Sequence, residues 1–182
     1  MMKKIFLGFS IIASLAISSE VEEIEIGKVE QCGMELAAVY LKPMDMSPKK
    51  DLQAKDADIH IEADIHALKE NVNGFEEGDW IPYLGINYEL KNLDNGASKK
   101  GTLVPMVAKD GPHYGLNIPM EKDRSKKFNP GNYKLTFHIQ SPEQQGLRRH
   151  TDHQTGVNAW CDNFSVSYDF KYSGSLYSSS SH

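Results

Sequence analysis

The stretch DIHIEADIHAL at residues 58–68 carries two imidazoles and two carboxylates at alternating positions. Successive side chains of a β-strand point to opposite faces, so His60, Glu62, Asp64 and His66 are expected to share one face of a strand. Residues two apart on a strand lie about 7 Å apart, which lets His60 and Glu62 bind one ion. The same polar residues also recur four apart, as in a helix, but the unbroken alternation favours the strand.

Two later segments gather similar side chains around predicted turns. They are Met106, Asp110 and His113 in residues 104–115, and His150, Asp152 and His153 in residues 148–156. Thioether sulfur favours copper, imidazole binds copper, zinc and iron, and carboxylates favour harder ions. The residues therefore predict a copper or iron site. From the residues alone the alternative stays open that the polar face of 58–68 is the solvated side of a sheet.

Short segments of period two, separated by Gly and Pro, must position these side chains. They are residues 34–42, 58–68, 83–92, 101–109, 113–120, 132–140 and 163–172. Such a pattern predicts an all-β fold, an antiparallel β-sandwich of two packed sheets. The Asn-Gly dipeptide within residues 92–101 predicts a hairpin there. The Gly-Asn-Tyr of 131–133 before a strand is typical of the tyrosine corner of immunoglobulin-like sandwiches.

Two strands near the end of the chain should supply much of the core, because their apolar residues alternate cleanly. These residues are Tyr133, Leu135, Phe137 and Ile139 on one strand, and Phe164, Val166, Tyr168 and Phe170 on the other.

The N-terminus reads as a secretory signal peptide over residues 1–19. Lys3 and Lys4 precede an apolar run that is too short to cross a bilayer. One domain over 20–175 and a Ser-rich flexible tail over 176–182 are then expected. Direct membrane insertion is not expected, since no later segment is long and apolar enough.

Charge and motifs exclude several functions. The formal net charge is −5 and becomes more negative by two once the signal peptide is removed, which does not suit a nucleic-acid partner. No hydrolase, nucleotide-binding or metalloprotease motif is present, so the protein is not expected to be an enzyme. A ferroxidase-like redox role has the least support, because no proton-handling or dioxygen site is visible.

Two cysteines, Cys32 and Cys161, lie near the two ends of the predicted domain. An exported protein meets an oxidising compartment, where such a pair can form a disulfide. The sequence leaves both the bridged and the free state open, because it does not give the distance between the Cα atoms.

Several long motifs together resemble the periplasmic iron-transport protein family of Gram-negative bacteria. They are MELAAVYL, ADIHIEADIHA, NGFEEGDWIPYLGINYELKN, KKGTLVPMVAKDGPHYG, GNYKLTF and RRHTDHQTGV, spread over about residues 25–175. Members of that family bind copper, are linked to iron uptake, and include a related metal-binding lipoprotein antigen of spirochaetes. The two cysteines are not part of the family pattern.

The resemblance implies an immunoglobulin-like β-sandwich that forms a homodimer, with a metal site near the subunit interface. The metal ligands it implies are His60, Glu62, Met106, Asp110, His113 and His150. His150 is chosen over His153 because the preceding Arg and the following Thr-Gly-Val fix the register. Asp64 and His66 receive a role beside the ligands or at the surface.

The implied function is high-affinity iron uptake in the periplasm. Copper would be held by the imidazoles and Met106, and iron beside it by Glu62 and Asp110, before delivery to an inner-membrane iron permease. Zinc or manganese are possible substitute ions. Two other hypotheses stay open: a copper or zinc sequestering protein without an iron-transport role, and a structural or adhesion sandwich whose histidines are incidental.

Overall fold

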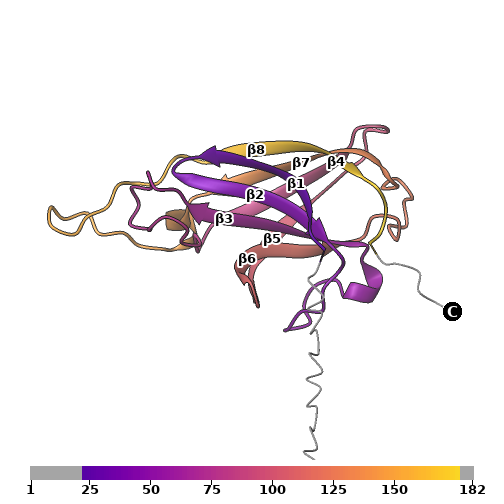
Figure 1. Ribbon diagram of the computed structural model, residues 1–182, viewed down its shortest axis with the longest axis horizontal. Coiled ribbons are helices and arrows are strands. Elements are labelled where there is room, and N and C mark those ends of the chain that lie inside the picture. Colours follow the sequence, from indigo (N-terminus) through magenta and orange to yellow (C-terminus); the bar gives the residue numbers. More distant parts are fainter. Residues whose placement is uncertain (1–21, 177–182) are drawn as a thin grey trace, which may run out of the picture.

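The computed structural model describes residues 22–176. The predicted signal peptide and residues 177–182 of the predicted tail lie outside the described residues. Eight strands and two short 3-10 helices make up the described chain (Figure 1). They are β1 (Ile24–Gln31), β2 (Met34–Leu41), η1 (Ala54–Asp56), β3 (Ile59–Ala67), β4 (Gly85–Asn92), β5 (Ser98–Ala108), β6 (Gly111–Ile118), β7 (Gly131–Gln140), η2 (Pro142–Gln145) and β8 (Phe164–Tyr172). The predicted all-β fold class is confirmed.

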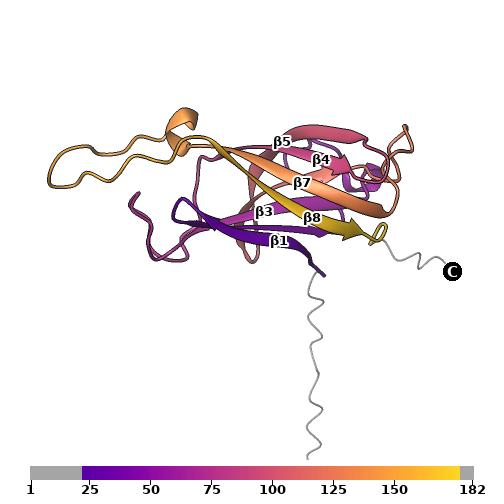
Figure 2. The same ribbon diagram turned by 90° about the horizontal axis from the view of Figure 1, so that it is seen from above.

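The strands are all antiparallel and follow the order β1-β2-β3-β6-β5-β4-β7-β8. Strand β5 belongs to both halves of this order. Its first half pairs with β4 and its second half, from Val104 onward, pairs with β6. A strand that switches partners in this way makes a corner between two packed layers. The result is a β-sandwich that approaches a barrel, and Figure 2 shows the two layers from above.

The two ends of the strand order, β1 and β8, pack against each other. A β-carbon at Gly27 of β1 would lie 2.7 Å from Cδ1 of Tyr168 on β8, so glycine permits this close approach. Beside Gly27, the pairing of β1 with β2 shifts register. Strand β1 was not among the predicted strands, because this irregularity breaks the alternation of its few apolar residues.

The predicted core of the late strands is largely correct. All four apolar residues of β7 are buried, as are Val166 and Tyr168 of β8, while Phe164 and Phe170 are half-buried. The predicted hairpin is also present, since β4 pairs with β5 across the Asn-Gly turn. The Tyr133 hydroxyl donates a 2.7 Å hydrogen bond to the backbone oxygen of Asn129, as in a tyrosine corner.

Cys32 and Cys161 form a disulfide, with their Cα atoms 6.1 Å apart. The bridge ties the turn between β1 and β2 to the segment that leads into β8, and it decides the question that the sequence left open. Among residues 22–176, no helix is long and apolar enough to cross a membrane.

Candidate metal centre

Strands β3 and β6 bring the predicted ligands together. In their register Glu62 lies opposite Gly115, and His60 lies opposite Asn117. Paired residues of neighbouring strands point to the same side, and so does His113, two positions before Gly115. His60 and Glu62 of β3 therefore lie on the same face of the sheet as His113 and Asn117 of β6.

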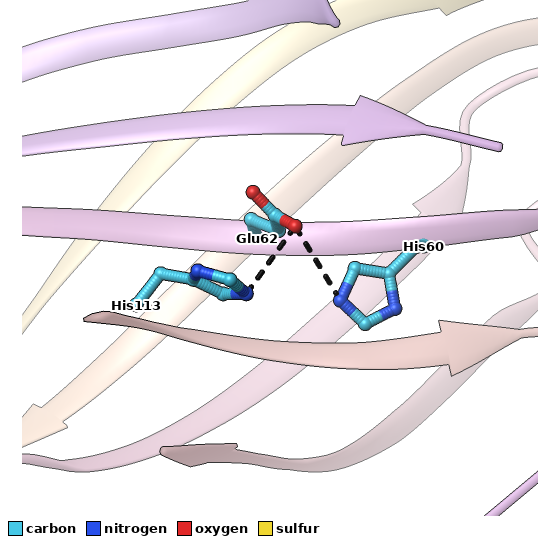
Figure 3. Close-up of side chains that lie close together, drawn as sticks. All are labelled: His60, Glu62 and His113. Carbon is cyan, nitrogen blue, oxygen red and sulfur yellow. Dashed lines mark ion pairs between the residues drawn. The ribbon is translucent and has the colours of Figure 1, made fainter. Parts of the chain in front are cut away.

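The three side chains meet at one carboxylate oxygen. Oε1 of Glu62 lies 3.6 Å from Nε2 of His60 and 3.3 Å from Nε2 of His113 (Figure 3). One ligand atom from each residue lies within 4.8 Å of the other two. All three residues are buried, and His60 is 0% exposed. This burial contradicts a solvated sheet surface at His60 and Glu62, whereas Asp64 and His66 on the same face are half-buried.

His60 shows most clearly that the cluster suits a metal. Its Nε2 is buried and has no hydrogen-bond partner among residues 22–176. Burial lowers the pKa of His60 from 6.5 to about 4, so the ring is neutral at neutral pH. A buried polar atom without a partner is costly, and a ligated metal would satisfy it.

Gly115 keeps the space in front of this atom open. A β-carbon at position 115 would lie 2.5 Å from Nε2 of His60. Any side chain there would displace the ring or cover its nitrogen. The sequence analysis did not single out this residue, although a glycine inside a predicted strand is a known signal of close approach.

An acidic cavity of about 240 Å³ adjoins the cluster. It is lined by Glu23, Glu62, Asp64, His66, Asp110, Gly111, Pro112 and His113. Burial raises the pKa of Glu62 from 4.5 to about 8, and the neighbouring carboxylates add to the shift. The pKa values of Glu23 and Asp64 are also raised, again chiefly by burial. A cation in the cavity would relieve the repulsion among these carboxylates.

The remaining predicted residues occupy different positions around the cluster. Met106 is half-buried and lies opposite His113 in the pairing of β5 with β6. Asp110 is exposed in the turn between these strands and lines the cavity, as Asp64 and His66 do from β3. Glu23 was not a candidate, because it precedes β1 and nothing in its local sequence places it beside β3.

His150 is separate from the cluster within this chain. Its side chain is 74% exposed, and its Nδ1 lies 2.7 Å from the Thr155 hydroxyl in the same loop. The loop between η2 and β8 extends beyond the sheets, as Figure 1 shows. His153, which the resemblance leaves unassigned, is also exposed there.

The donor atoms present fit copper. Two imidazoles and a carboxylate converge, and a thioether side chain stands on the strand next to them. Imidazole binds copper in both common oxidation states and thioether sulfur favours Cu(I), while the carboxylates of the cavity suit harder ions such as iron.

The fold and the cluster define the chain as an antiparallel β-sandwich protein with a buried candidate metal site between two adjacent strands. Residues 20–174 match the Fe2+ transport protein family, and the chain belongs to this family. A curated relative, the 34 kDa membrane antigen of Treponema pallidum, is 34% identical over 84% of this chain and 76% of its own length. A Brucella abortus protein of the UPF0423 group is 46% identical over 88% and 87% of the two chains.

Two solved structures are similar in both fold and sequence. The copper-reconstituted P19 protein from Campylobacter jejuni is 61% identical, with a TM-score of 0.83 over 85% of this chain and 98% of that one. FetP from uropathogenic Escherichia coli strain F11, expressed in the periplasm, is 53% identical, with a TM-score of 0.79 over 84% and 97%. The predicted family is thus confirmed.

Proposed function

We propose that this protein binds copper through His60, Met106 and His113 and takes part in iron uptake. The observation that carries the proposal is the buried cluster, in which the unpartnered Nε2 of His60 faces a carboxylate at the wall of an acidic cavity. Copper would supply a centre that changes oxidation state there, since thioether sulfur favours Cu(I) and imidazole accepts both states. The copper-bound P19 structure supports the choice of metal.

Iron is the transported ion in this proposal. Glu62 and Asp110 both line the cavity and would hold iron next to the copper ligands. Carboxylate oxygens suit iron better than the thioether does. The family match supports the iron role. The protein would bind iron in the periplasm, after export by its signal peptide, and pass it to an inner-membrane permease without acting as an enzyme.

A homodimer would account for His150. His150 is exposed and lies outside the cluster of its own chain. In a dimer it would instead complete the metal site of the second copy. Its neighbour Arg148 is also exposed, and the positive charge of this side chain is complementary to an acidic cavity. Sedimentation of the protein should give twice the monomer mass, and a monomer at micromolar concentration would contradict an interfacial role for His150.

Copper affinity tests the site. The metal-free protein, His113→Ala and Met106→Leu should be compared by competition with a chelator of known affinity. His138→Ala is a matched control, because His138 is exposed on β7 and contacts Ser165 outside the cluster. Tight binding that is lost in His113→Ala but kept in His138→Ala is expected. Equal binding by all variants would exclude the cluster as the site.

Growth tests the iron role against the alternative of a copper or zinc sequestering protein. A strain without this protein should grow more slowly at low iron and normal copper, and the gene for unaltered protein should restore growth better than Glu62→Gln. A defect seen under copper stress but not under iron limitation would favour the sequestering function instead.

A further inference from the structure

Within the described part of the chain, the imidazole of His60 has one hydrogen-bond partner, the side chain of Asn117 on β6. Nδ1 of His60 lies 2.9 Å from Oδ1 of Asn117, and both residues are almost fully buried. We propose that Asn117 is a positioning residue that holds the proton of His60 on Nδ1 and thereby presents Nε2 as an unprotonated metal ligand. The inference rests on the proposed copper site.

Three backbone groups fix the orientation of the Asn117 amide. Its Nδ2 donates to the backbone oxygens of Met44, at 2.8 Å, and Leu52, at 2.9 Å. Its Oδ1 accepts a 3.1 Å hydrogen bond from the backbone N–H of Met44. A flipped amide would turn its oxygen toward two carbonyl oxygens and its NH2 group toward an N–H donor. The oxygen must therefore face His60.

The fixed amide determines the tautomer of the imidazole. Oδ1 of Asn117 is an acceptor, so Nδ1 of His60 must be the donor in their hydrogen bond. A neutral imidazole carries one N–H, which leaves the lone pair on Nε2. That atom faces Oε1 of Glu62 at 3.6 Å, beyond hydrogen-bond range. The lone pairs of Nε2 of His60 and Oε1 of Glu62 are thus directed at one place, as in a metal site. Metal-binding histidines are commonly oriented by a hydrogen-bond partner on their other ring nitrogen, as Asn117 would orient His60.

Asn117 also holds the loop between β2 and η1, through Met44 and Leu52. A loss of copper binding on substitution could therefore come from a loosened loop. Two variants separate the causes. Asn117→Asp keeps an oxygen acceptor for Nδ1 but loses both donor bonds to the loop, whereas Asn117→Leu loses the acceptor as well.

Asn92 provides a matched control. It is buried, its Nδ2 donates to the backbone oxygen of Lys127, and its Oδ1 accepts from the backbone N–H of Asp94. It ties backbone groups near a hairpin, as Asn117 ties those of its loop, and it also donates to the hydroxyl of Tyr133. None of these partners belongs to the metal cluster. Asn92→Leu should lower stability and leave copper affinity unchanged.

Copper affinity and the electron paramagnetic resonance spectrum of the Cu(II)-loaded form should be measured for the unaltered protein, Asn117→Asp, Asn117→Leu and Asn92→Leu. Asn117→Leu is expected to bind copper about 10- to 100-fold more weakly and to show a changed spectrum. Asn117→Asp should retain most of the affinity and a spectrum close to that of the unaltered protein. Equal losses in both variants would mean that Asn117 acts only through the loop, and would overturn the proposal.

A second measurement needs no variant at position 117. The 15N chemical shifts of the His60 ring in the unaltered, metal-free protein report which nitrogen carries the proton, and His60→Gln identifies the signals. Protonation at Nδ1 is expected, and protonation at Nε2 would overturn the inference even if copper binds. Absence of copper binding by the unaltered protein would instead refute the proposed function, and with it the role of Asn117 toward a metal.

Discussion

Replacing Glu62 with glutamine should stabilise the metal-free protein at high pH. The pKa of Glu62 rises from 4.5 to about 8 in the fold, chiefly because the carboxyl group is buried. The protonated Glu62 carboxyl therefore contributes fully to stability below pH 4.5, and this contribution is lost as the pH rises through about 8. The reason is that the carboxyl ionises in the unfolded chain at a lower pH than in the fold. Glutamine has nearly the same shape and does not ionise.

The shift sets the size of the effect. Moving a pKa from 4.5 to about 8 corresponds to at most about 5 kcal/mol. Water in the open cavity screens the charges, so we expect about 2–3 kcal/mol. Urea unfolding of the metal-free unaltered protein and Glu62→Gln, each with a chelator at pH 5 and pH 9, measures the difference.

Glu62→Gln should be more stable than the unaltered protein by this amount at pH 9 and nearly equal to it at pH 5. A stability difference that does not change between the two pH values would refute the argument. The same variant should bind metal more weakly, because it loses an anionic ligand. Gain of stability with loss of binding would mark Glu62 as a residue that costs the fold stability for the sake of its site.

Three further substitutions test other parts of the structure. Gly115→Ala places a methyl group 2.5 Å from Nε2 of His60, so copper affinity in a competition assay should fall by about tenfold or more, and unchanged affinity would contradict the geometry. Cys32→Ser opens a bridge between residues 129 apart in sequence and should lower the urea-unfolding free energy by about 5 kcal/mol in the chain-entropy model. A loss of copper affinity in the same variant would show that the metal site needs the bridge as well. Met106→Leu should weaken Cu(I) binding more than Cu(II) binding, as separate chelator competitions would detect; a parallel loss would speak against a thioether ligand.

The local pattern of β3 was sufficient to predict a strand with four polar residues on one face. Alternation could not tell whether this face is solvated, because burial depends on what lies beside and over it. Here β6 pairs with β3, and the turn between β5 and β6 lines the cavity next to the carboxylates. Only this packing buries part of a polar face and makes it a group of candidate metal ligands.

Residues that act through neighbours were harder to predict. Gly115 and Asn117 matter because the register of β6 places them opposite Glu62 and His60. Glu23 reaches the cavity from the start of the described chain. None of these roles has a local sequence signal that decides it, since each depends on a strand pairing or a loop contact distant in sequence.

The sequence by itself determined the all-β class, the core faces of the late strands and, through long motifs, the family. These features follow from side-chain alternation and residue order, which are local properties of the chain. Only the tertiary structure decided that the cysteines are bridged, that His60 and Glu62 are buried beside His113, and that His150 lies apart in its own chain. Distance and exposure are set by the packing of segments far apart in sequence, and no local pattern encodes them.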